Sequence, residues 1–159
     1  WESSDQPRRF LGNDLVLAIY TNELLSRLLP EAEKHQKVFD GYWHYLIMIN
    51  EQSDAEKEYS LRLFENLLLE ELGYGLEFNK DSTGSPIDSE LEYQFQEHEG
   101  FVAKVDGNIP GEVLLVVNDD DNDRLSVGHL AILKKLNRKR LRSILGERPL
   151  KSRELFFAN

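Results

Sequence analysis

The strongest chemical pattern in this sequence is a group of cations near its C-terminal end. At 100° per residue, five basic side chains of a predicted helix fall on one arc of about 140°, opposite its apolar stripe. They are Lys134, Lys135, Arg138, Lys139 and Arg142. Such a face could neutralise phosphates independently of sequence, or hold an acidic peptide. It could equally be a solvated face, or a set of counter-charges for the acidic remainder of the chain, and basic last turns also favour the helix dipole.

The distribution of charge along the chain makes this basic segment stand out. The formal net charge is −10. Residues 134–159 hold 9 Lys/Arg and 2 Asp/Glu, a balance of +7, which leaves −17 for residues 1–133. Since salt screens charges beyond about 8 Å at physiological ionic strength, the local surface matters more to a ligand than the total. An anionic partner therefore has one attractive region.

A second candidate site lies in the predicted helix that begins at Ser53. Arg62 is expected to project away from the core, with Leu69 exposed two turns further on. A cation beside an exposed apolar side chain could receive a peptide that ends in a hydrophobe and a carboxylate. The alternative is an i,i+4 ion pair between Glu58 and Arg62, which contributes only about 0.2–0.5 kcal/mol. The pattern alone favours the ion pair.

Polar residues in the helix expected over residues 13–29 form a third cluster. Asn22, Glu23, Ser26 and Arg27 share one arc of an otherwise apolar helix. The favoured interpretation is a buried polar network that fixes packing register, and a partner contact is the alternative. In the last helix, Arg140 projects into the apolar stripe, so we expect a structural role for it.

The sequence gives no pattern for catalysis or metal binding. It contains no cysteine, so thiolate metal ligands are excluded. The acidic run from Asp119 to Asp123 fails the EF-hand pattern, because the sixth position is Arg124 and the twelfth is Leu130. The four histidines lack zinc-like spacing, and no nucleophile elbow or phosphate loop occurs. We therefore expect neither an enzyme nor a cofactor.

The expected fold is mainly α, a helical bundle with a small insertion that contains a β-hairpin. Helices are predicted over residues 13–29, 33–50, 53–72 and 126–145, the third opened by a capping box, Ser53-x-x-Glu56. The insertion covers about residues 79–125: a hairpin through Tyr93 and Phe101, a strand or buried extended piece over 114–117, and an acidic loop over 118–124. No apolar run approaches the roughly 20 residues of a membrane span, and a cytoplasmic protein is expected.

Three ordered stretches resemble the RecO family of bacterial recombination and repair proteins. The first is the segment from Tyr20 to Pro30. The second is Leu61-Arg-Leu-Phe-Glu65, followed by the Gly-Tyr-Gly segment from Glu71 to Phe78. The third, and most similar, runs from Gly146 to Phe156 and contains the signature residues Arg148, Pro149, Lys151, Ser152 and Arg153. The resemblance covers about residues 13–157.

The resemblance implies a DNA repair and recombination mediator. Members bind and anneal single-stranded DNA and work with RecR to load RecA. They also dock the acidic C-terminal tail of single-stranded-DNA-binding protein, and Arg62 resembles the residue that engages this tail. The chain looks like a zinc-free branch, because cysteines that many members carry after the Gly-Tyr-Gly motif are missing.

The resemblance also implies a domain organisation. Residues 1–12 correspond to a junction after an N-terminal OB-fold domain that has no counterpart here, and residues 13–159 correspond to the helical C-terminal domain. DNA binding without the OB-fold is expected to be weak. The expected location is the cytoplasm, in association with the nucleoid. The alternative function is structural support for the OB-fold, with no ligand of its own.

Overall fold

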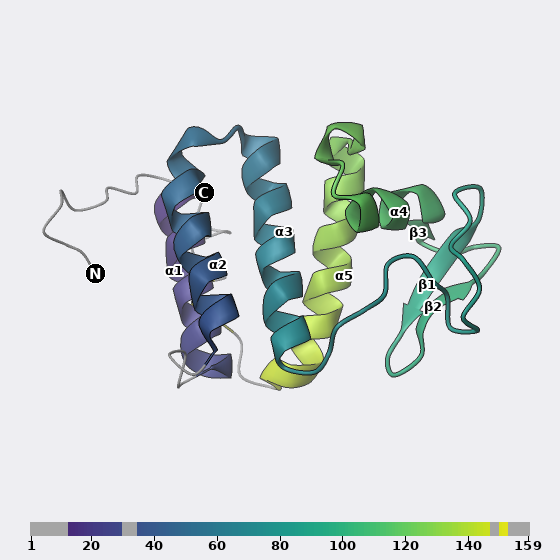
Figure 1. The fold of residues 1–159 in the computed structure, drawn as a ribbon, viewed down its shortest axis with the longest axis horizontal. Coiled ribbons are helices and arrows are strands. Elements are labelled where there is room, and N and C mark those ends of the chain that lie inside the picture. The colour runs from purple at the N-terminus through teal and green to yellow at the C-terminus, as the bar shows by residue number, and fades with distance from the viewer. Residues whose placement is uncertain (1–12, 30–34, 147–149, 153–159) are drawn as a thin grey trace, which may run out of the picture. The chain divides into compact units, whose positions relative to one another are not determined.

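The chain forms five α-helices and one small antiparallel sheet in the part that the computed structural model describes, residues 13–29, 35–146 and 150–152 (Figure 1). The main elements are α1 (Asn13–Leu28), α2 (Gln36–Met48), α3 (Asp54–Glu71), β1 (Glu92–Gln96), β2 (Gly100–Ala103), β3 (Ile109–Pro110), α4 (Gly111–Asp119) and α5 (Val127–Leu145). Two short 3-10 turns, η2 (Ile49–Glu51) and η3 (Asn122–Arg124), follow α2 and α4. The predicted mainly α class with a small β insertion is confirmed.

The chain divides into two compact units. One contains the described residues up to Gln52 together with those from Leu145 onward, and the other is Ser53–Ile144. The second unit holds α3, the sheet, α4 and most of α5. The predicted junction at residues 1–12 lies outside the described residues.

In the first unit, the polar arc of α1 binds the C-terminal segment. The Glu23 carboxylate accepts hydrogen bonds from the backbone amides of Lys151 and Ser152, at 2.8 and 2.9 Å. Arg27 donates to the Leu145 carbonyl oxygen at 3.1 Å. Glu23 and Arg27 thus contact the chain itself, as the favoured interpretation requires. The prediction that the arc is buried is wrong, because Glu23 and Arg27 are half-buried and Asn22 and Ser26 are exposed.

Helix α3 begins after the capping box at Ser53 and ends just before Gly73. The Ser53 hydroxyl accepts from the Glu56 amide, and the Glu56 carboxylate accepts from the Ser53 amide, which forms the predicted capping box. Beyond the last turn, Gly73 has a φ of +91°, a left-handed conformation that glycine adopts without a steric penalty. The same device ends α5 at Gly146, with a φ of +72°.

The insertion is a three-stranded antiparallel sheet of order β2-β1-β3 packed on helices. The predicted hairpin is confirmed, with Tyr93 paired to Ala103 and Phe95 to Phe101. Alternate residues of β1 face the core, as the polar and apolar alternation requires. Buried residues of the sheet, the loop before it, α4 and α5 form one core: Ile87, Tyr93, Phe95, Phe101, Ile109, Leu114 and Leu136.

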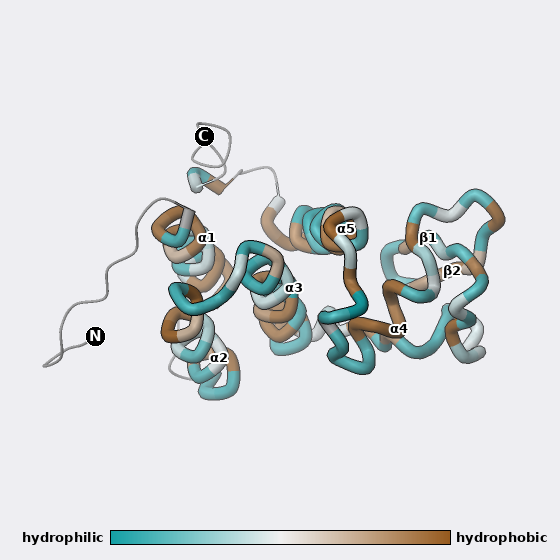
Figure 2. Tube along the Cα trace, turned by 90° about the horizontal axis from the view of Figure 1, so that it is seen from above, coloured by the Kyte–Doolittle hydropathy of each residue, from teal (hydrophilic) through white to brown (hydrophobic). Residues whose placement is uncertain are grey.

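The prediction of an extended segment at residues 114–117 is wrong, because these residues belong to α4. The run from Val113 to Val117 is apolar throughout, so it carries no helical period, and its valines favour strands. Tertiary packing overrides this preference: four of the five side chains are buried, and Leu115 is partly so. Figure 2 shows α4 as a mostly hydrophobic segment. The acidic loop therefore starts two residues later than predicted, because residues 118 and 119 still belong to α4.

Candidate partner-binding surface on helix α5

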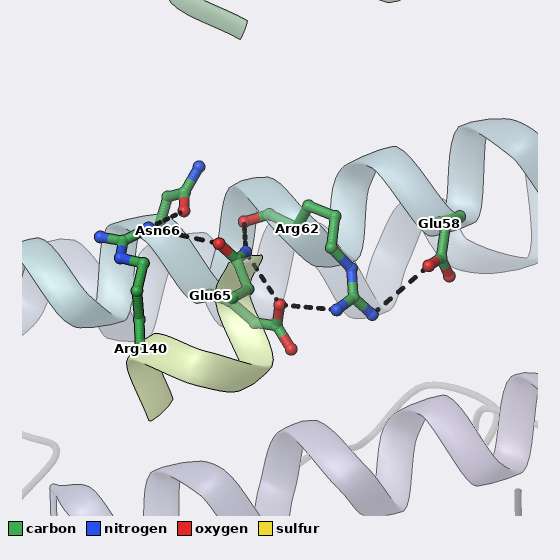
Figure 3. Close-up of polar contacts among 6 residues, drawn as sticks. Glu58, Arg62, Glu65, Asn66 and Arg140 are labelled. Carbon is green, nitrogen blue, oxygen red and sulfur yellow. Dashed lines mark hydrogen bonds and ion pairs between the residues drawn. The ribbon is translucent and has the colours of Figure 1, made fainter. Parts of the chain in front are cut away.

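Helix α5 is joined to α3 by a network of buried polar side chains, which Figure 3 shows in close-up. Glu65 is fully buried, at 0% exposed. Its carboxylate accepts from Arg62 Nη1 and from Asn137 Nδ2, both at 3.0 Å. Asn137 Nδ2 also lies 3.2 Å from the Arg62 carbonyl oxygen. Because a buried carboxylate is costly unless it is paired, these contacts hold α5 in register against α3.

Arg140 forms the other end of this network. Its Nη1 donates to Asn66 Oδ1 at 2.7 Å and to Asn137 Oδ1 at 3.3 Å, and its Nη2 donates to the Tyr74 carbonyl oxygen at 3.1 Å. The guanidinium also lies over the Phe78 ring, 6.0 Å from its centroid. Burial lowers the pKa of Arg140 to about 10, opposed by the charge of Glu65, so the group stays protonated at neutral pH. The predicted structural role of Arg140 is confirmed.

The expectation that Arg62 and Leu69 are exposed is wrong. Arg62 is 4% exposed and Leu69 is 0% exposed. Arg62 Nη1 pairs with Glu65 at 3.0 Å, and its Nη2 lies 3.6 Å from Glu58, the i,i+4 pair that the pattern favoured. The error has a geometric cause. Buried side chains of α3 span about 220° of its circumference at 100° per residue, so a helix with a single core-facing stripe is the wrong description.

The five predicted cations lie on one face of α5 and differ in their surroundings. Lys134 and Arg138 are half-buried, and Lys135, Lys139 and Arg142 are exposed. Lys139 lies at one edge of this face, where its Nζ donates to the Phe95 carbonyl oxygen at 3.0 Å and lies 5.7 Å from the Phe95 ring centroid. Within the described part of the chain, the other four make no side-chain hydrogen bond or ion pair.

Lys134 marks the opposite edge of this cationic face, next to α3. Its pKa is lowered, first by burial and then by the positive charge of Arg138. Arg62 lowers it as well, whereas Glu58 and Glu65 act in the opposite sense. Lys134 therefore lies among charges of both signs, with Arg138 beside it on the cationic face and the carboxylates of Glu58 and Glu65 on α3.

A small pocket lies beside the cationic face, between α5 and the sheet. Its volume is about 130 Å³. Phe95, Ile109, Ile132 and Leu136 give it an apolar lining, and Lys135 and Lys139 line it as well. The sequence did not predict this pocket, because its lining comes from three separate segments of the chain. The only signal was the i,i+3 and i,i+4 spacing of two lysines with two apolar residues on one helix.

The remaining predictions concern the C-terminal signature, metals and membranes. Lys151 and Ser152 contact Glu23 through their amides, and Arg148, Pro149 and Arg153 lie outside the described residues. Within the residues that the structure describes, no group of three or more His, Asp or Glu side chains is placed to hold a metal ion. No helix among those residues has the length and apolar character needed to cross a membrane.

A family model and the similar proteins with known names indicate the same family. Residues 11–154 match the family model described as "Recombination protein O C terminal". The chain is 36% identical over 161 residues to a DNA repair protein RecO of Pseudoalteromonas translucida, which covers 100% of this chain and 68% of the relative. Proteins of the same name from Yersinia enterocolitica and Glaesserella parasuis are each 37% identical, covering 91% and 89% of this chain and 61% and 60% of the relatives. These names support a role in DNA repair and recombination.

Proposed function

The chain belongs to the RecO family, and we propose that it is an adaptor domain that captures an acidic partner segment on the cationic face of α5. The partner that the family resemblance implies is the acidic C-terminal tail of single-stranded-DNA-binding protein. One observation carries the proposal: Lys134, Lys135, Arg138 and Arg142 have no carboxylate partner among the described residues, and an apolar pocket adjoins them.

The proposed mechanism combines electrostatic capture with an apolar anchor. Acidic side chains of the tail lie along Arg138 and Arg142, where association is favoured by the local positive potential. The terminal hydrophobe enters the pocket lined by Ile132 and Leu136, and the adjacent carboxylate pairs with Lys135. Because the contacts are largely ionic, affinity falls as salt concentration rises.

In this proposal Arg62 is a positioning residue, and Leu69 contributes packing. Arg62 neutralises Glu65, which in turn binds Asn137 and so fixes the register of α5. Loss of Arg62 would therefore weaken tail binding indirectly, through the placement of α5. Direct engagement of the tail by Arg62 and Leu69 would need both side chains to leave their buried positions.

The functions of the whole protein are proposals too, because the chain spans only 60–68% of the length of these relatives. We propose that the domain works with RecR to load RecA and to anneal DNA strands. Single-stranded DNA would compete with the acidic tail for the same cations, since both present closely spaced negative charges. The domain itself performs no chemistry in this scheme.

A fluorescence-anisotropy titration with the labelled tail peptide tests the proposal. Exposed ionic contacts contribute about 0.2–1 kcal/mol each, so Lys135→Gln with Arg142→Gln should weaken binding about two- to thirtyfold at low salt. The matched control is Lys37→Gln with Lys104→Gln, which removes the same charge from exposed positions elsewhere and should leave affinity within about twofold. Equal losses in both pairs would overturn the proposal, because they would indicate only a non-specific charge effect.

A second candidate function is structural support for a neighbouring domain. The buried network between α3 and α5 favours it, because such networks rigidify a scaffold. This alternative predicts tail binding no stronger than that of a scrambled peptide of the same composition. The titration above, run with both peptides, separates the two functions.

A further inference from the structure

Arg140 is a buried guanidinium to which the described part of the chain gives no carboxylate partner. It is 5% exposed, and its hydrogen bonds go to neutral oxygens of Asn66, Asn137 and Tyr74. A guanidinium carries five N–H donors. The donor on Nε and one of the two on Nη2 therefore have no acceptor among the described residues. Buried charges are normally paired. The charge of Glu65 favours the protonated guanidinium, but no carboxylate among the described residues contacts it, so its two remaining donors can bind an anionic group.

Arg140 lines a cavity where the end of α3, the β1–β2 hairpin and α5 meet. The volume of this cavity is about 360 Å³, which falls in the range of about 300–1,000 Å³ that is usual for small-molecule sites. Leu76, Phe95 and Phe101 give it apolar walls, and Gly73 and Gly75 bring the backbone close to it. A cavity with apolar walls and a buried cation suits a ligand with an apolar body and one carboxylate.

The rest of the lining selects among such ligands by charge. The other titratable side chains around the cavity are Tyr74, Glu77, Lys80, Asp81, Glu97, His98 and Glu99. The carboxylates outnumber the lysine by four to one, so they would repel a polyanion such as DNA or an acidic tail. Asp81 already accepts hydrogen bonds from Thr83 and Ser85. The three exposed glutamates remain available for a cationic group.

We propose that this cavity binds a small zwitterion, an α-amino acid or a ligand of the same chemical class. The ligand carboxylate would take the free N–H donors of Arg140, as planar guanidinium and carboxylate groups pair well. Its ammonium group would face the rim glutamates, and its apolar body would lie against the wall formed by Leu76, Phe95 and Phe101. The site shares only Phe95 with the pocket beside the cationic face of α5, and the inference does not rest on the proposed adaptor function.

NMR of the full 159-residue chain tests the inference with L-phenylalanine as the probe. Titration should shift the Arg140 Nε–H resonance saturably. L-phenylalaninamide, which lacks the carboxylate, and N-acetyl-L-phenylalanine, which lacks the ammonium, should each bind at least about tenfold more weakly. Absence of a saturable shift, or equal binding of all three compounds, would overturn the inference with the wild-type protein alone.

Variants locate the site on the protein. Arg140→Lys keeps the charge but loses the planar donor pair, and should weaken binding of the zwitterion at least about tenfold. Because this change touches the buried network, a rim variant provides an independent test: Glu97→Gln with Glu99→Gln should weaken binding of L-phenylalanine and leave that of the N-acetyl compound unchanged. The control, Glu90→Gln with Glu112→Gln, removes two exposed carboxylates that do not line the cavity and should have no effect.

Discussion

The two faces of helix α5 use charge in opposite ways. Toward α3, Asn137 and Arg140 are buried, and their hydrogen bonds go to fixed polar partners. Away from α3, Lys135 and Arg142 are exposed and have no ion pair among the described residues. The inward groups are held by the fold, and Arg140 keeps only two donors without an acceptor among the described residues, whereas the outward groups keep their whole charge available to a partner. Burial and partners, and not the density of cations in the sequence, separate a structural charge from a binding charge.

The largest expected effect comes from breaking the inward face. Glu65→Ala leaves Arg62 buried without its closest carboxylate, and removal of one member of a buried ion pair costs about 3–5 kcal/mol in the free energy of unfolding. Urea denaturation measures it. The control is Glu58→Ala, whose carboxylate is 30% exposed and lies 3.6 Å from Arg62, and this change should cost less than about 1 kcal/mol. Similar costs for both variants would contradict the structural role of the buried network.

A substitution in the pocket beside the outward face can separate the apolar contribution to partner binding from the ionic contribution. Ile132→Ser should weaken tail-peptide binding by about 1–2 kcal/mol, because a half-buried apolar side chain no longer lines the pocket. Raising the salt concentration should lower the peptide affinity of the wild-type protein and of this variant by the same factor. A loss of affinity that disappears at high salt would show that Ile132 acts through the lysines and not as an anchor.

The capping box of α3 should contribute less than the buried pair, although it positions the same helix. Ser53→Ala removes the acceptor of the Glu56 amide, and loss of such a cap costs about 1 kcal/mol in the free energy of unfolding. Thermal denaturation monitored by circular dichroism measures the change. Ser53→Asn, which restores an acceptor, should recover most of it. An unchanged midpoint in Ser53→Ala would mean that α3 does not depend on its cap.

The smallest effect is a dependence of stability on pH in the first unit. Burial alone would raise the pKa of Glu23, but hydrogen bonds from the amides of Ser152 and Lys151 outweigh burial, and the pKa is lowered. A carboxyl group with a lowered pKa stabilises the fold above its unfolded pKa, and this contribution is lost as pH falls through the folded pKa. Glu23→Gln should therefore reduce stability at neutral pH and flatten its decline in acid. Parallel profiles for the wild type and the variant would contradict the contact.

Much of the fold follows from local sequence signals, whereas the site depends on contacts between distant segments. The capping box at Ser53 and the alternating hairpin at Tyr93 act over a few residues, and both were predicted. Helix α4 was not, because a uniformly apolar run has no period and takes its conformation from its neighbours. The network of Arg62 and Glu65 was missed for a related reason, because it includes Asn137 of α5, a helix that begins 65 residues after Arg62.

The candidate site shows the same division. The cationic arc could be predicted, since helical geometry alone places those residues together. The pocket lined by Phe95, Ile109 and Ile132 could not, because the sheet must first pack on α5. The unbalanced charge of Arg140 was also invisible in the sequence, since it depends on which side chains surround the guanidinium.

The most direct test of the account is an NMR titration of the full chain with the acidic tail peptide, following backbone amides and the Ile132 methyl groups. The account predicts that chemical shifts change along the outward face of α5, at Lys135, Arg138 and Arg142, and at Ile132, with little change at Glu65. If the changes instead concentrate around Arg62 and Leu69 while the outward face of α5 is unaffected, the cationic face is not the binding surface.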